Sequence, residues 1–88
     1  MESGRRRIVR EHEFEEQLAE LIRDEESADE FINAAELILA ENPYLGTLVE
    51  AEARIFMLAL PPIDDRGIKL FYTFNEEEVL FMYVVAFD

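Results

Sequence analysis

The stretch IKLFYTFNEEEVLFMYVVAFD, residues 68–88, decides the fold class of this 88-residue sequence. Apolar side chains alternate along residues 68–74, which is the pattern of a β-strand with one buried face. The side chains that share one side of this strand are Ile68, Leu70, Tyr72 and Phe74. Residues 75–78 form an acidic turn, and residues 79–87 are apolar on both faces, as in a strand at the centre of a sheet. The stretch therefore predicts a β-hairpin.

Two amphipathic helices precede this hairpin. Apolar residues recur at a spacing of about 3.6 in residues 11–24 and again in residues 28–41. Ser27 followed by Glu30 is a capping box, which predicts the start of the second helix. Pro43 ends that helix, because the residue before a proline avoids helical dihedral angles. The short connection between the helices predicts a helical hairpin.

Two further segments have the composition of strands. Residues 6–10 form a short first strand, and residues 54–60 are a nearly continuous apolar run that we expect to end at residues 61–62, two prolines. The sequence predicts an α+β fold, with an N-terminal strand, a helical hairpin and then a three-stranded antiparallel sheet. We expect a single domain over residues 1–88, with residues 1–4 disordered. The side chains expected in its core, themselves or through an immediate neighbour, are Phe14, Leu18, Phe31, Ile38, Ile55, Leu70 and Tyr72.

The composition excludes several classes of protein. There is no cysteine, which rules out a disulfide framework, a thiolate metal site and a cysteine nucleophile. No apolar run reaches the roughly 20 residues that span a bilayer, and the basic N-terminus lacks the apolar segment of a secretory signal. We expect a soluble, cytoplasmic protein with no cofactor and no membrane partner.

The net charge of −13 bears on nucleic-acid binding. After residue 10 there are four basic and 20 acidic residues, a net charge of −16, which repels a phosphate backbone. The only clustered cations lie in residues 5–10, and a solvated strand explains them as well as an anion site does. RNA binding is therefore disfavoured, or confined to this segment.

Four stretches in this order resemble the RelE/ParE superfamily of toxins from bacterial toxin–antitoxin modules. They are RIVREHEFEEQLAELI (7–22), AAELILAENPYLGTLV (34–49), ARIFMLALPPIDDRGIKLFYTF (53–74) and EEVLFMYVVAFD (77–88). The resemblance covers nearly the whole chain. It implies a toxin component neutralised by an antitoxin, either a ribosome-dependent messenger-RNA endonuclease that needs no metal or an inhibitor of DNA gyrase.

The resemblance also implies catalytic residues. Arg54 and Lys69 match the family's basic strand positions, and Tyr72 matches its aromatic position. Such groups could supply the base, the acid and the cations that RNA cleavage requires. Most other basic residues of the family have no counterpart here, and the last strand carries no basic or histidine-containing end. The alternatives are a weakened or inactive toxin and a non-enzymatic protein-interaction module on the same scaffold. Cross-strand pairing and a half-buried tyrosine would explain the three residues equally.

The last strand also predicts a partner surface. Two helices cover one face of a sheet, whereas residues 79–87 are apolar on both faces. Strict alternation would place Phe81 on one face and Met82 and Val84 on the other, and we expect these three residues to contribute to partner binding. The expected occupant is an antitoxin segment or a second copy of the chain in a homodimer.

Three further sets of residues carry groups that could take part in catalysis or binding. His12 is the only histidine and could act as a base, but a solvent-facing position among acids explains it too. The acidic pairs and runs at residues 64–65 and 76–78 lack the spacing of a calcium loop, so we expect solvated turns and no metal. The aromatic residues of the strands could stack on bases, but we expect them to form the core.

Overall fold

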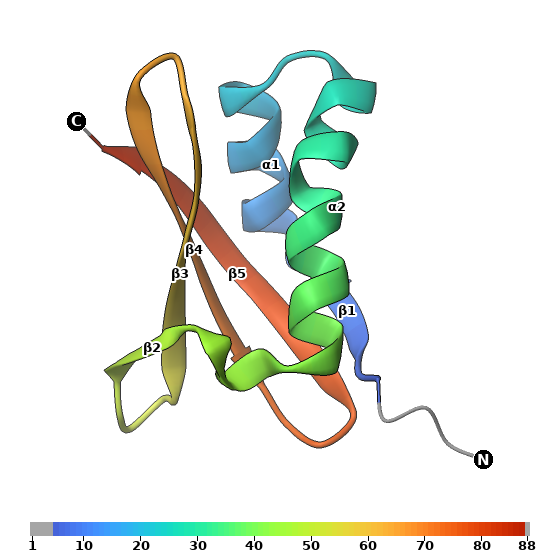
Figure 1. The fold of residues 1–88 in the computed structure, drawn as a ribbon, viewed down its shortest axis with the longest axis vertical. Coiled ribbons are helices and arrows are strands. Elements are labelled where there is room, and N and C mark those ends of the chain that lie inside the picture. Colours follow the sequence, from blue (N-terminus) through green and yellow to red (C-terminus); the bar gives the residue numbers. More distant parts are fainter. Residues whose placement is uncertain (1–4, 88) are drawn as a thin grey trace.

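The computed structural model describes residues 5–87, which form an α+β fold with two helices on one face of a five-stranded mixed sheet (Figure 1). In chain order the elements are β1 (Arg7–Arg10), α1 (His12–Leu21), α2 (Glu25–Glu41), the 3-10 helix η1 (Pro43–Leu45), β2 (Thr47–Glu50), β3 (Ile55–Ile63), β4 (Arg66–Phe74) and β5 (Glu78–Phe87). The predicted α+β class and helical hairpin are confirmed. The disorder predicted for residues 1–4 lies outside the described residues.

The sheet is larger than predicted. Its strand order is β1-β5-β4-β3-β2, and β1 pairs in parallel with β5 while the other neighbours are antiparallel. The prediction of a three-stranded antiparallel sheet is therefore wrong in detail, because β1 joins one edge and β2 the other. The β2 sequence, Thr-Leu-Val-Glu, is too short to show an alternating pattern, and all four residues are exposed.

Strand β3 continues through the two prolines that we expected to end it. β2 pairs with β3 only at Ile55, Phe56 and Met57, so the rest of this β3 edge has no neighbouring strand among the described residues. Proline lacks a backbone N–H and is tolerated at such an edge. Pro61 and Pro62 therefore lie within β3.

The connection from β3 to β4 is a two-residue turn. Asp64 and Asp65 have φ angles of 50° and 65°, the left-handed conformation that a type I′ hairpin turn requires at both central residues. Aspartate adopts this conformation more readily than most residues. β3 and β4 thus form a tight hairpin.

The second helix begins earlier than predicted. Asp24 is its N-cap, and its carboxylate accepts hydrogen bonds from the Ser27 N–H at 3.0 Å and from the Ser27 hydroxyl at 2.7 Å. These bonds satisfy an N–H group that the helix itself leaves free. Ser27 is therefore the donor to the cap and not the cap residue that we predicted.

One core lies between the helices and the sheet. Its apolar side chains include Phe14, Leu18, Ala28, Ile32, Ala35, Leu39, Phe56, Ile68, Leu70, Tyr72, Val79, Phe81 and Val84. Phe14, Leu18, Leu70 and Tyr72 are buried as predicted. Ile38 is 47% exposed, because the buried face of α2 is centred on Ala35 and passes through its neighbour Leu39.

Phe31 and Ile55 are only partly buried, but their immediate neighbours Ile32 and Phe56 are buried, as the prediction allowed. Phe31 packs against the margin of the core. Ile55 is the first residue of β3 and lies beside Glu50 at the end of β2, where the sheet ends.

A β-bulge interrupts β5. Phe71 pairs with Tyr83 and Tyr72 pairs with Phe81, so Met82 is an extra residue without a partner in β4. The side-chain oxygen of Gln17 in α1 accepts a hydrogen bond from the Val84 N–H at 2.8 Å, next to the bulge. The bulge reverses the alternation, so Phe81 and Val84 are both buried beneath the helices. The strict alternation predicted for this strand is therefore wrong.

Candidate functional site

Tyr72, one of the three predicted catalytic residues, has a structural role. Its side chain is fully buried, and its hydroxyl donates to the Pro43 carbonyl at 2.8 Å and accepts from the Gly46 N–H at 3.0 Å. Burial raises the pKa of Tyr72, and the hydrogen bond from Gly46 partly opposes this increase. The hydroxyl therefore joins η1 to β4 and is not presented to a substrate.

Lys69 lies on the opposite face of the sheet. Along β4 the side chains alternate, and Tyr72 pairs with the buried Phe81 while Lys69 pairs with the exposed Val85. The Lys69 ammonium is 4.4 Å from the centre of the Phe87 ring, a cation–π distance.

Arg54 lies before β3 rather than inside it. It has a φ of 56° and ends the turn that leads into the strand. Its guanidinium carbon is 6.0 Å from the centre of the Phe74 ring, and Phe74 packs against the core beside Tyr72. The structure therefore does not bring Arg54, Lys69 and Tyr72 together around one point.

The other acid–base candidates are on the surface. His12 is in the first turn of α1, and its imidazole is 87% exposed and 3.0 Å from the Glu16 carboxylate. Within residues 5–87 no group of three or more histidine, aspartate or glutamate side chains is arranged to hold a metal ion. In the same part of the chain, no helix has both the length and the apolar character needed to cross a membrane.

The face of the sheet opposite the helices is apolar. Phe14 of α1 contacts the Phe81 ring, and Tyr44 of η1 contacts Phe56 and Phe74, so the described helices all pack on one side. Figure 1 shows α1 and α2 as one layer beside the sheet. We call the other side the open face. By strand register its residues in β3, β4 and β5 are Met57, Ala59, Lys69, Phe71, Thr73, Leu80, Tyr83, Val85 and Phe87.

Aromatic contacts organise the open face. The rings of Phe71 and Tyr83 stack with their centres 4.9 Å apart. Beside them Val85 is 37% exposed and Phe87 is 42% exposed. Apolar side chains of this kind lie on neighbouring strands, and a large uncovered apolar patch on a monomer usually marks an interface.

The predicted partner-binding residues do not all belong to this surface. Phe81 is fully buried and Val84 is 2% exposed, both in the core beneath the helices. Only Met82, the bulge residue, is partly exposed. The alternation of residues 68–74 already places Phe71 opposite the buried Leu70 and Tyr72. Sequence reasoning missed Tyr83 as a member of the open face, because the bulge that reverses the alternation of β5 could not be recognised from the sequence.

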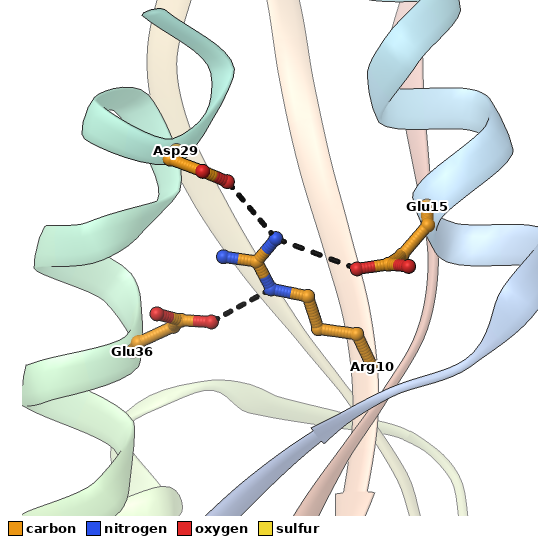
Figure 2. A network of polar contacts seen from close by, with 4 residues as sticks. All are labelled: Arg10, Glu15, Asp29 and Glu36. Carbon is orange, nitrogen blue, oxygen red and sulfur yellow. Dashed lines mark hydrogen bonds and ion pairs between the residues drawn. The ribbon is translucent and has the colours of Figure 1, made fainter. Parts of the chain in front are cut away.

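Arg10 of β1 lies in a cluster of carboxylates from both helices and so joins β1 to them (Figure 2). Its guanidinium lies 2.8 Å from the Glu36 carboxylate, 3.2 Å from Asp29 and 3.6 Å from Glu15. Burial alone would lower the pKa of Arg10, but the hydrogen bonds and charges of Glu36 and Asp29 outweigh this effect and raise it. The sequence suggested a solvated basic strand or an anion site here and not an ion cluster, although Asp29 and Glu36 are seven residues apart and hence on one side of α2.

A cavity of about 550 Å³ opens beside this cluster, between the end of α1 and the start of α2. Apolar side chains such as Leu18 and Ala28 line it together with Arg10, Glu15 and Asp29. Because the Arg10 guanidinium is already paired with carboxylates, it holds elements together and is not poised to bind an anion.

A scan of protein-family models finds none that matches the chain, and a search of curated proteins finds no relative. The resemblance to RelE/ParE toxins therefore rests on the sequence stretches quoted above and stays a prediction.

Proposed function

We propose that this chain is a non-enzymatic protein-interaction module with a RelE/ParE-like order of elements, which binds a partner protein on the open face of its sheet. The observation that carries the proposal is the contrast between the two faces. One face is buried under α1, α2 and η1, while the other carries the Phe71–Tyr83 stack and the exposed Val85. Apolar side chains left in water cost free energy that a partner can recover by covering them.

The positions of the three predicted catalytic residues support the absence of catalysis. A general acid or base must lie within hydrogen-bond reach of the proton that it transfers. The Tyr72 hydroxyl is already paired with two backbone groups, and Lys69 is on the other side of the sheet. A single substrate phosphate therefore cannot contact the Tyr72 hydroxyl and the Lys69 ammonium at the same time.

An RNA-cleaving toxin that an antitoxin neutralises is the second candidate. It is favoured by Arg54, which is exposed, and by Lys69, whose ammonium lies beside the exposed Phe87 ring on the open face. The order of a strand, a helical hairpin and an antiparallel hairpin is also the order that the resemblance implies.

A cleavage assay separates the two candidates. Purified chain would be added to ribosomes translating a defined messenger RNA, and the RNA would be mapped by primer extension, alongside Lys69→Ala and Arg54→Ala variants. We expect the wild-type chain to produce no cleavage above the ribosome-only background, and its expression to leave growth unchanged. Cleavage that Lys69→Ala or Arg54→Ala abolishes would replace this proposal with the toxin.

A further inference from the structure

We infer that the occupant of the open face is an amphipathic α-helix of a partner protein, apolar along its middle and carrying lysine or arginine at both ends. This inference rests on the proposed function and specifies the chemistry of the partner. Three features of the open face support it: the charge at its two ends, the lack of acidic charge between them, and its length.

Acidic turns lie at both ends of the open face. Asp64 and Asp65 form the turn before β4, and Glu76 and Glu77 lie in the turn after it. Figure 1 shows these two hairpin turns at opposite ends of the sheet. All four residues are exposed. A partner with a cation near each end would gain attraction at both turns.

The surface between the turns lacks free acidic charge, although the whole chain carries 21 acidic residues. In the described strands the acidic residues are Glu50 and Glu78. Glu78 is paired with Arg7, and the Glu50 carboxylate accepts hydrogen bonds from the N–H groups of Glu52 and Ala53. Lys69 is a cation on this face, and its ammonium lies over the Phe87 ring. The rest of the middle of the open face suits an apolar partner surface.

The dimensions of the face suit a helix. β4 has nine residues and extends roughly 30 Å, the length of a helix of about 20 residues. β4 has hydrogen-bonded neighbours on both sides, so a partner cannot add a strand beside it. β5 has β1 beside it only at residues 78–81, so the rest of that edge has no neighbouring strand among the described residues. On the open face itself a partner packs side chains against both strands, as α1 and α2 already do on the other face.

A second copy of the chain fits this surface less well. Two open faces in contact would bring four acidic turns together, and each chain has only 8 lysine and arginine residues against 21 acids. Like charges in contact oppose association. The charge distribution therefore favours a basic partner over the homodimer.

Two synthetic 20-residue helical peptides test the inference. They would share one stripe of leucine and isoleucine and differ only at their ends, which carry three lysines each in one peptide and three glutamates each in the other. Binding would be followed by fluorescence anisotropy at physiological salt. We expect saturable binding of the lysine peptide at least about ten-fold tighter than that of the glutamate peptide.

Two matched single variants locate the binding. Val85→Lys places a charge on the open face, whereas Leu37→Lys makes the same charge change at a 52% exposed position on α2. We expect Val85→Lys to weaken binding of the lysine peptide by about ten-fold or more, and Leu37→Lys to change it less than about three-fold. Circular dichroism would verify that both variants are folded.

Neutralising the acidic turns tests the role of charge. A variant with Asp64 and Asp65 changed to Asn and Glu76 and Glu77 changed to Gln should bind the lysine peptide about three- to ten-fold more weakly and with less dependence on salt. Asparagine also accepts the left-handed conformation of the first turn. The control variant has the same net charge but neutralises four exposed helix residues, Glu13, Glu20, Glu26 and Glu30.

Three results would overturn the inference. Equal binding of both peptides, weakened by Val85→Lys, would exclude the basic partner while leaving the open face as an interaction surface. Binding of neither peptide would exclude the helix. A dimer at micromolar concentration in sedimentation that Val85→Lys dissociates would identify the occupant as a second copy.

Discussion

The hydroxyl of Tyr72 in β4 accepts a hydrogen bond from the backbone N–H of Gly46, over a distance of 3.0 Å. The same hydroxyl donates to the Pro43 carbonyl at 2.8 Å, so one side chain binds both ends of the segment that connects α2 to β2. This relationship explains why a tyrosine occupies a fully buried position.

Tyr72→Phe should destabilise the protein by about 1–3 kcal/mol, because it leaves the Gly46 N–H and the Pro43 carbonyl without this partner. The free energy of unfolding would be measured by urea denaturation. Tyr83→Phe on the open face is the matched control, for which we expect a change within about 0.5 kcal/mol. Equal stability of Tyr72→Phe and wild type would contradict the structural role.

Gly46→Ala should also destabilise the fold, since the added Cβ would lie 2.4 Å from the Tyr72 hydroxyl oxygen and 2.7 Å from the Met57 carbonyl oxygen. Overpacking of this kind costs about 1–3 kcal/mol. Gly67→Ala is the comparison, because the atoms nearest to its Cβ would belong to the ring of Phe87, a 42% exposed side chain rather than backbone. Thermal unfolding should rank the Gly46 variant as the less stable of the two, and the reverse order would contradict this packing.

Arg10→Met should lower the free energy of unfolding by about 1–3 kcal/mol, because it leaves Glu36 and Asp29 facing each other without the guanidinium that bridges them. The Arg10 side chain is 20% exposed, and solvent screening keeps this loss below that of a fully buried pair. Glu15→Gln removes the longest of the three contacts, made by an exposed carboxylate, so we expect a change of about 0–1 kcal/mol. A larger loss for Glu15→Gln than for Arg10→Met, measured by denaturation, would show that the cluster is assigned wrongly.

The cap of α2 should make stability depend on pH. The hydrogen bonds from the Ser27 hydroxyl and N–H lower the pKa of Asp24 from its ordinary value of 3.8. A carboxylate with a depressed folded-state pKa contributes stability above its unfolded value, and the contribution is lost as the pH falls through the folded value. Asp24→Ala should therefore have a lower melting temperature than wild type at pH 7, and the gap should close as the pH falls below 3.8. A gap that persists unchanged at low pH would contradict the role of the ionised carboxylate.

The local elements could be predicted from sequence because each follows from a period within one segment. The helical spacing in residues 11–24 and 28–41 placed both helices, and the alternation of residues 68–74 placed β4 and its buried Leu70 and Tyr72. Sequence periodicity also suggested that an apolar surface would remain uncovered.

Features that depend on neighbours distant in the sequence could not be predicted. β2 exists because it pairs with β3, and the prolines of β3 are tolerated because that edge is free. The bulge at Met82 depends on register with β4, and it decides that Val84 is buried and that Tyr83 and Val85 are on the open face. Predicting the ion cluster of Arg10 required knowing that α2 lies against β1.

Site-specific photocrosslinking in the protein's native cells tests the interaction surface most directly. A photoreactive benzoylphenylalanine would replace Val85 on the open face in one variant and Leu37 on α2 in the other, two exposed apolar positions. We expect a discrete covalent adduct with a different protein at position 85 and no such adduct at position 37. The absence of any adduct at position 85, or the same adducts at both positions, would contradict the proposal that the open face binds a partner.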